Sequence, residues 1–169
     1  MATKLKKLYE GKAKIIYAKN SNQVIATYKN DATAFNNLKK GSIKNKGAIN
    51  NAISSYLFQI LNHCDIPTHF IKKIDKKSQL LKKVDIIPIE VLVRNLFAGS
   101  LSKKFGIKEG TPLSDTLIEY CLKSDELGDP HISSEHILNL GLCDFDELEL
   151  INEYSLRIND VLRLSLIHI

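Results

Sequence analysis

The chain has 169 residues, of which 44% are hydrophobic and 25% are charged, and its net charge is +5 at pH 7. These values are typical of soluble globular proteins, so composition argues against a disordered chain and against a membrane protein. No apolar run approaches the ~20 residues of a spanning helix, and no apolar signal core follows the first lysines, which predicts a cytoplasmic protein without a membrane partner.

The first part of the chain predicts a hairpin followed by a helix. Residues 14–17 and 24–28 are rich in β-branched and aromatic side chains and flank a polar turn at 19–22. Apolar residues then recur at helical spacing within residues 47–64, namely Ile49, Ile53, Tyr56, Leu57, Ile60 and Leu61. The other side of this helix would carry Asn50, Asn51, Ser54 and Ser55. We therefore expect an amphipathic helix whose apolar side packs on the sheet.

The middle of the chain mixes predicted strands with a short helix. After Pro67 ends the helical region, strands are expected at 68–74, 86–93 and 117–122, and Pro88 makes the second of these an edge or bulged strand. A short helix is expected at 99–106, where a glycine stands at each end. This order of elements predicts an α+β fold with an antiparallel sheet rather than alternating βαβ units.

A long helix is predicted near the end of the chain. Asp144, followed three positions later by Glu147, resembles a capping box. The apolar stripe of this helix consists of Leu148, Ile151, Tyr154, Ile158, Val161 and Leu162. The apolar residues 164–169 carry no stop signal, so we interpret them as an interrupted element.

Charge is divided unevenly along the chain. Residues 1–84 hold 17 Lys and Arg against 4 Asp and Glu, whereas residues 85–169 hold 7 against 15. A basic half and an acidic half could form a cleft that attracts a phosphorylated ligand and holds cations. A basic nucleic-acid-binding module is the rival interpretation. The aromatic and basic stretches of an RNA-binding sheet and the spacing of a helix-turn-helix or zinc finger are not found in the sequence.

The three cysteines, Cys64, Cys121 and Cys143, are widely spaced and form no CxxC pair. This spacing argues against a disulfide framework or a structural zinc site. We expect all three to be ordinary buried or half-buried residues, because no catalytic base accompanies them.

Gly11, Lys12, Ala13 and Lys14 stand at the start of the first predicted strand. Alternation along a strand would place the two lysines on one face, where they could cradle phosphate oxygens. The alternative is a solvated basic strand end, since lysines at sheet edges also prevent pairing between sheets.

Arg94 ends an apolar strand, and Gly99 and Ser100 begin a helix shortly after it. A guanidinium group can bind a phosphate or carboxylate with two hydrogen bonds. The start of a helix can add backbone donors and a hydroxyl group to the same anion. The alternative is an ion pair between Arg94 and an acid such as Glu90.

The loop of residues 123–130 combines a lysine with three acids and ends in Asp129-Pro130. Loops on rigid scaffolds often carry site residues, and an exposed acidic turn is the alternative. His131 and His136 are five positions apart, which does not place them on one helical face, so we expect no two-histidine metal site.

Six segments, taken in order, resemble the SAICAR synthetase family: LYEGKAK, KNDATAFN, KGAINN, VDIIPIEVLVRN, AGSLSKKFGIKEG and KSDELGDP. The resemblance extends over residues 8–163. The family joins the carboxylate of the ribotide CAIR to the amine of L-aspartate in purine biosynthesis, with hydrolysis of ATP and a requirement for magnesium. An ATP-dependent carboxylate-amine ligase is therefore the function that the resemblance implies.

The resemblance also implies a fold and a set of site residues. The fold would be α+β, with an antiparallel sheet in an ATP-binding lobe at residues 1–85 and a second α+β lobe at 86–169, related to ATP-grasp and kinase-like nucleotide binders. Residues implied for ATP are Lys12, Ala13, Lys14, Lys82 and Glu90. Residues implied for the substrates are Arg94, Ser100 and Asp125, and those implied at the reacting groups are Lys123 and Asp129.

The family's metal-binding carboxylates follow the long helix and would lie beyond Ile169. We therefore expect no metal ligands and little turnover from these residues alone. The implied partners are small molecules, with no nucleic acid, and a homo-oligomer is compatible with the sequence. Another small-molecule phosphotransferase, which would not require aspartate, remains the enzymatic alternative.

Overall fold

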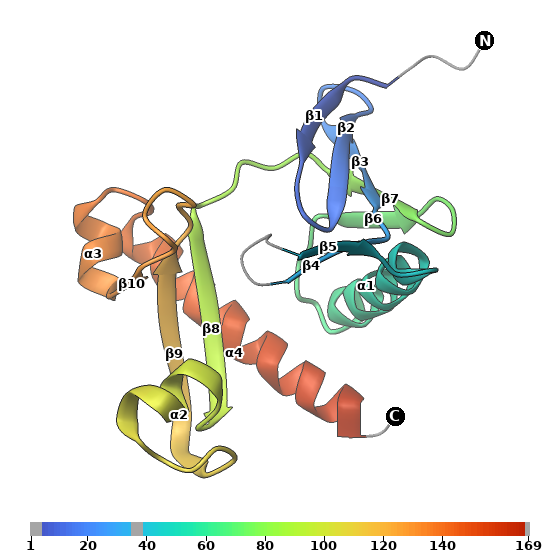
Figure 1. Ribbon diagram of the computed structural model, residues 1–169. Helices are drawn as coiled ribbons and strands as arrows, with labels where there is room; N and C mark the ends of the chain where they lie inside the picture. Colours follow the sequence, from blue (N-terminus) through green and yellow to red (C-terminus); the bar gives the residue numbers. More distant parts are fainter. Residues whose placement is uncertain (1–4, 35–38, 168–169) are drawn as a thin grey trace. The chain divides into compact units, whose positions relative to one another are not determined.

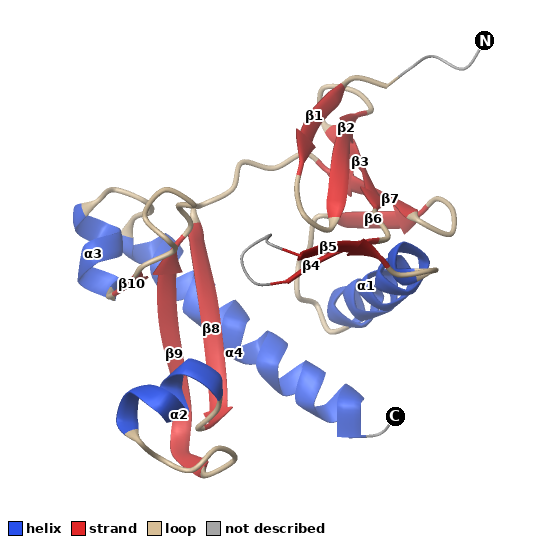
Figure 2. Cartoon of the chain, in the orientation of Figure 1, coloured by secondary structure: helices blue, strands red, loops and turns tan. Residues whose placement is uncertain are grey.

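The computed structural model describes residues 5–34 and 39–167, and the chain forms two compact units, Met1–Asp85 and Ile86–Ile169. We call them unit 1 and unit 2 (Figures 1 and 2). Every strand pair in the described residues is antiparallel. This confirms the predicted α+β fold. The last two residues of the segment KNDATAFN and the last two residues of the chain lie outside the described residues.

In its described residues, unit 1 contains a five-stranded sheet, a two-stranded ribbon and one helix (Figure 1). The sheet has the order β1 (Lys7–Glu10), β2 (Lys14–Ala18), β3 (Gln23–Tyr28), β7 (Ser78–Lys82) and β6 (Phe70–Lys73). The ribbon consists of β4 (Asp31–Ala34) and β5 (Lys39–Ser42), and the helix is α1 (Lys46–His63). The predicted hairpin is the pair β2 and β3, while β1, β4, β5 and β7 were not predicted.

The core of unit 1 lies between α1 and the sheet. Its buried apolar residues are Val24, Ala26, Phe70 and Leu81, and Ile16 and Phe58 pack against them. Because side chains alternate along a strand, β3 presents Val24 and Ala26 to the helix and turns its intervening residues to the other face of the sheet. The ring of Phe58 on α1 stacks on Phe70 with 5.7 Å between the ring centres.

The predicted helix is present as α1. In its first turns, however, the polar side packs on the sheet, whereas the apolar side was expected to do so. Ile49 and Ile53 are each 54% exposed, whereas Asn51 is fully buried and Ser55 is 3% exposed. The expected orientation of the apolar stripe was therefore wrong for this part of the helix. Only toward its C-terminal end does α1 bury a large apolar residue, Leu61.

Two features of the facing strands explain the burial of polar side chains by α1. Gly47 lies so close to β3 that a Cβ atom there would be 2.6 Å from the carbonyl oxygen of Tyr28. At this short separation the facing side chains are polar: Ser55 Oγ donates to Gln79 Oε1 at 3.2 Å, and Gln79 Nε2 donates to the hydroxyl oxygen of Tyr28 at 2.8 Å. The hydroxyl of Tyr28 in turn donates to Ser54 Oγ at 2.9 Å. Burial costs little here because these groups bond to one another.

Unit 2 is built on a long β-hairpin covered by helices. Its sheet has the order β10 (His131–Ile132), β9 (Pro112–Leu122) and β8 (Ile89–Leu96), and its helices are α2 (Gly99–Phe105), α3 (Ser134–Asn139) and α4 (Phe145–Ile167). In Figure 2, α4 crosses the hairpin obliquely, and α2 and α3 lie at the hairpin's opposite ends. The strand predicted at 86–93 begins only at Ile89, directly after Pro88.

The core of unit 2 is apolar, as the sequence predicts. Tyr120, Ile137, Cys143 and Leu148 are buried together. The apolar stripe of α4 is buried or half-buried throughout. Its start is a capping box, since Glu147 N donates to Asp144 Oδ1 at 2.8 Å and Asp144 N donates to Glu147 Oε2 at 3.0 Å.

The three cysteines differ in their exposure. Cys121 and Cys143 are buried as expected, but Cys64 is exposed, because it lies at the C-terminal end of α1. Among the described residues, no helix is both long and apolar enough to cross a membrane.

Candidate functional site

One face of the β8–β9 hairpin carries three of the six site residues predicted in unit 2, namely Glu90, Arg94 and Lys123. Glu90 pairs in register with Cys121, and Leu92 pairs with Glu119. Since Ile89, Val91 and Tyr120 belong to the core, alternation turns their neighbours to the opposite face. We call this face the charged hairpin face; it comprises Glu90, Arg94, Glu119, Cys121 and Lys123.

Arg94 is held at the end of β8 by three contacts. Its Nε donates to Glu119 Oε2, and its terminal nitrogens lie 3.5 Å from the carbonyl oxygen of Ala98 and 3.3 Å from Ser100 Oγ. The alternative interpretation, an ion pair between Arg94 and an acid, is therefore present, with Glu119 rather than Glu90 as the acid. Arg94 and Ser100, both predicted to bind the ribotide, are therefore neighbours.

Lys123 lies between two carboxylates at the other end of this face. Its Nζ is 2.7 Å from Asp129 Oδ2 and 3.7 Å from Glu90 Oε2. The hydrogen bond from Lys123 to Asp129 raises the pKa of the lysine, and the charges of Asp129, Glu90 and Asp125 raise it further. Lys123 is thus a cation at neutral pH, suited to bind a carboxylate or phosphate rather than to act as a base.

The loop after β9 fixes the position of Asp129. Ser124 N donates to Asp129 Oδ1 at 2.9 Å, and Asp129 N donates back to the carbonyl oxygen of Ser124 at 3.1 Å. Asp129 has a positive φ of 51°, a conformation that costs free energy in a residue other than glycine and that is often found at functional sites. Asp125 is exposed in the same loop.

Sequence reasoning missed the two groups that lie next to these residues. Cys121 Sγ is 3.6 Å from His131 Nδ1, and burial together with the charges of Glu90 and Glu119 raises the pKa of the thiol. Glu119 had no distinguishing signal in the sequence, because only the strand register places it diagonally opposite Arg94.

The predicted ATP-binding residues of unit 1 lie at the turn between β1 and β2. The turn is closed by a hydrogen bond from Gly11 N to the carbonyl oxygen of Lys14 at 3.0 Å, and Lys29 N donates to the carbonyl oxygen of Ala13 at 2.8 Å. Because β2 begins at Lys14, Lys12 lies in the turn rather than on the strand. The alternation argument that placed the two lysines on one face therefore does not apply to Lys12.

Lys14 and Lys82 lie on opposite faces of the sheet. Lys14 shares the helix-facing side with Ile16, and its charge adds to the burial that lowers the pKa of His69. Lys82 follows Leu81, which packs in the core, so alternation turns Lys82 to the other side. Lys12 is exposed in the turn.

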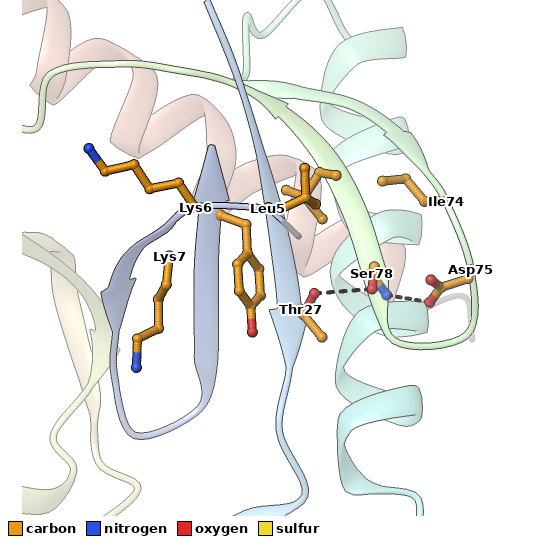
Figure 3. Close-up of a pocket in the computed structure, with 9 residues that line it drawn as sticks. Leu5, Lys6, Lys7, Thr27, Ile74, Asp75 and Ser78 are labelled. Atoms are coloured by element: carbon orange, nitrogen blue, oxygen red, sulfur yellow. Dashed lines mark hydrogen bonds between the residues drawn. The ribbon is translucent and has the colours of Figure 1, made fainter. Parts of the chain in front are cut away.

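A groove of about 940 Å³ lies on the sheet face away from α1 (Figure 3). Its lining residues are Leu5, Lys6, Lys7, Tyr17, Ile25, Thr27, Ile74, Asp75 and Ser78. Thr27 Oγ1 and Ser78 Oγ are 3.2 Å apart, and Ser78 N donates to Asp75 Oδ1 at 2.9 Å. None of the four predicted ATP-binding residues of unit 1 lines this groove, so it lends no support to that assignment.

The structure thus groups Glu90, Arg94, Ser100, Lys123 and Asp129 within unit 2 and Lys12, Ala13 and Lys14 within unit 1. The described residues contain no group of three or more His, Cys, Asp and Glu side chains that could hold a metal ion.

Comparison with known proteins assigns the family. The SAICAR synthetase family model matches residues 7–166. The chain belongs to the SAICAR synthetase family. It is 51% identical over 161 residues to the phosphoribosylaminoimidazole-succinocarboxamide synthase of Clostridium botulinum (strain Alaska E43 / Type E3), covering 95% of this chain and 68% of the relative. It is 50% identical to that of Sphingopyxis alaskensis over 156 residues, covering 92% of this chain and 60% of the relative.

Solved SAICAR synthetase structures have the same fold. The crystal structure of the enzyme from Ehrlichia chaffeensis matches with a TM-score of 0.89 and 50% identity, over 92% of this chain and 66% of that one. A SAICAR synthetase in complex with ADP matches with a TM-score of 0.90 and 39% identity, over 95% of this chain and 68% of that one. The chain thus spans between three fifths and about two thirds of the length of these SAICAR synthetases.

Proposed function

We propose that this chain carries the nucleotide-binding and ribotide-binding parts of a SAICAR synthetase, which ligates L-aspartate to CAIR at the expense of ATP. The observation that supports this most is the charged hairpin face. Arg94 at one end of this face contacts Ser100, and Lys123 at the other end contacts Asp129, in a chain that belongs to this family. An ADP complex of a 39% identical relative supports the nucleotide as a ligand.

The reaction needs no nucleophilic side chain. A carboxylate oxygen of CAIR attacks the γ-phosphorus of ATP, and ADP leaves with the bond electrons. The amine of aspartate then attacks the acyl phosphate, phosphate departs, the amine loses a proton, and an amide remains. Catalysis of this kind depends on holding anions close together and on neutralising their charge, which suits a site of cations and oriented carboxylates.

Unit 1 is proposed as the nucleotide-binding part. Lys12 at the turn and Lys14 at the start of β2 would bind the ATP phosphates, and the backbone of Ala13 would approach them. Lys82 would border the adenine and ribose, and the resemblance to the family implies the same role for Glu90, which belongs to unit 2. Magnesium would accompany ATP, as the resemblance to the family implies.

Unit 2 is proposed as the ribotide-binding and aspartate-binding part. Arg94 and Ser100 would bind the phosphate of CAIR. Lys123 would bind the reacting carboxylate of CAIR, and Asp129 would hold that lysine in place and face the incoming amine. Asp125, exposed in the same loop, would contact aspartate.

Calorimetric titrations of the chain with ADP and with CAIR test this proposal. We expect Lys14→Met to weaken ADP binding and Arg94→Met to weaken CAIR binding, each by about 10-fold to 100-fold, since a charged hydrogen bond contributes about 1.5–3 kcal/mol. Arg157→Met is the matched control, because Arg157 belongs to an exposed pair with Glu153 on α4. Absence of binding of both ligands to the unsubstituted chain would contradict the proposal.

A coupled assay of ADP release separates this proposal from another phosphotransferase. ADP release that requires both CAIR and aspartate would support the ligase, whereas release without aspartate would support the phosphotransferase. We expect these 169 residues to release ADP slowly, because the described residues offer no metal-binding group.

A further inference from the structure

The ion pair between Arg94 and Glu119 has an unusual geometry for a residue that binds an anion. The carboxylate of Glu119 accepts from Nε, at the inner edge of the guanidinium group. The two terminal nitrogens instead lie near neutral oxygens, those of Ala98 at 3.5 Å and of Ser100 at 3.3 Å. A guanidinium group has five N–H donors, four of which are on the terminal nitrogens. Glu119 therefore occupies one donor and leaves the terminal nitrogens to neutral partners.

The pair is well placed to be rigid. Arg94 pairs in register with Leu117 and Leu92 pairs with Glu119, so the two side chains stand diagonally on adjacent strands. Their side chains are only 16% and 18% exposed, so they are less screened by water than a surface pair. The contacts with Ala98 and Ser100 join the start of α2 to the same group.

The negative charge of Glu119 does not by itself explain why this residue lies next to an anion-binding arginine. A carboxylate next to Arg94 weakens the attraction between the guanidinium group and an anion, so it would lower affinity if charge were its only contribution. What it adds is orientation: an arginine side chain that is already ordered loses less conformational entropy when it binds a ligand.

We propose that Glu119 is a positioning residue, which holds Arg94 by Nε so that its terminal nitrogens are presented to an oxyanion beside Ser100. The identity of that oxyanion, the phosphate of CAIR, rests on the proposed function. The ordering of the Arg94 side chain by its hydrogen bond to Glu119 does not depend on the proposed function, and it can be measured separately.

The sequence makes this measurement simple, because the whole chain contains three arginines, Arg94, Arg157 and Arg163. The Nε–H signals of three arginines are readily resolved by NMR and can be assigned with single Arg→Lys variants. We expect the signal of Arg94, whose side chain is 16% exposed, to show more restricted motion than that of Arg157, whose side chain is 41% exposed. In Glu119→Ala the Arg94 signal should become as mobile as that of Arg157.

A neutral isostere separates orientation from charge. Glu119→Gln keeps an oxygen that can accept from Nε but removes the charge, so it should bind CAIR within about threefold of the unsubstituted chain. Glu119→Ala should bind CAIR about 10-fold more weakly, which corresponds to the ordering cost of one long side chain. Glu153→Gln, which removes a carboxylate from the exposed pair on α4, is the matched control.

Two probes distinguish failure of this inference from failure of the proposed function. Inorganic phosphate tests the oxyanion site, because it should shift the Arg94 signal in the unsubstituted chain and in Glu119→Gln, but much less in Glu119→Ala. CAIR, measured by calorimetry, tests the ribotide. If phosphate acts as expected and CAIR does not bind, the proposed function fails while the role of Glu119 stands.

Three results would overturn the role of Glu119. The first is an Arg94 signal as mobile in the unsubstituted chain as that of Arg157. The second is a Glu119→Ala variant that binds phosphate and CAIR as the unsubstituted chain does. The third is equal loss of binding in Glu119→Gln and Glu119→Ala, which would indicate a role of charge or of folding; the thermal midpoints of both variants show which.

Discussion

Helices α1 and α4 both carry apolar residues at helical spacing, yet they pack on their strands with opposite sides. On α4 the apolar stripe faces the core, where Leu148 is 4% exposed. On the first turns of α1 the apolar side faces outward, with Ile53 54% exposed, and Asn51 and Ser55 are buried instead. The same sequence pattern thus led to a correct prediction for one helix and a wrong one for the other.

The difference lies in what the facing strands offer. Strand β9 presents Ile118 and Tyr120 toward the core that α4 completes, so burial of apolar area determines the orientation. Strands β3 and β7 present the hydroxyl of Tyr28 and the amide of Gln79 to α1. A polar helix side is buried there because Ser55 Oγ and Asn51 Nδ2 find partners, although Asn51 Oδ1 accepts no hydrogen bond from the described residues.

The largest effect is expected from Gly47→Ala, because α1 lies very close to β3 at Gly47. The added Cβ atom would be 2.6 Å from the carbonyl oxygen of Tyr28, so α1 must move away and its polar contacts lengthen. We expect a loss of about 3 kcal/mol in the free energy of unfolding, measured with urea. Gly41→Ala is the control, since that Cβ atom meets nothing within 4 Å. Equal stability of the two variants would show that α1 does not approach β3 this closely.

A somewhat smaller effect is expected from Gln79→Leu, which removes the centre of the polar contacts under α1. Ser55 Oγ would lose its acceptor and the hydroxyl oxygen of Tyr28 would lose a donor. Unsatisfied buried groups of this kind cost about 2 kcal/mol in total, after the gain from burying leucine. The same substitution at Gln59, which is exposed on α1, should change stability by less than about 0.5 kcal/mol. A stable Gln79→Leu variant would mean that α1 can bury apolar residues equally well.

Much of the fold follows from local patterns, and the exceptions have physical causes. The hairpin of β2 and β3, the short α2 and the capped α4 have strong local signals. Strand β7 was missed although it lies in the interior of the sheet, because it begins with Ser78 and Gln79, which are buried through contacts with residues far away in the chain. Periodicity cannot reveal such pairings, since the partners come from separate elements.

In the candidate site, too, sequence patterns do not reveal residues that depend on pairing between strands. Arg94, Ser100, Lys123 and Asp129 could be named from the sequence because they stand in segments that resemble a known family. Glu119 could not, since a glutamate in an apolar strand is common and its meaning depends on which residue lies diagonally across the hairpin. Strand register, which sequence reasoning rarely provides, is what identifies it.

The smallest effect is expected from Ile53→Gln, and it tests whether the outward side of α1 is exposed to solvent. Because Ile53 is 54% exposed, the change should alter the free energy of unfolding by less than about 0.5 kcal/mol. The same substitution at Ile137, which is fully buried in unit 2, should cost at least about 3 kcal/mol, because it removes apolar burial and encloses an amide without partners. If Ile53→Gln instead destabilised the chain as strongly as Ile137→Gln, the apolar side of α1 would have to face a core after all. The contrast between the two helices would then disappear, and with it the explanation of why polar residues lie under α1.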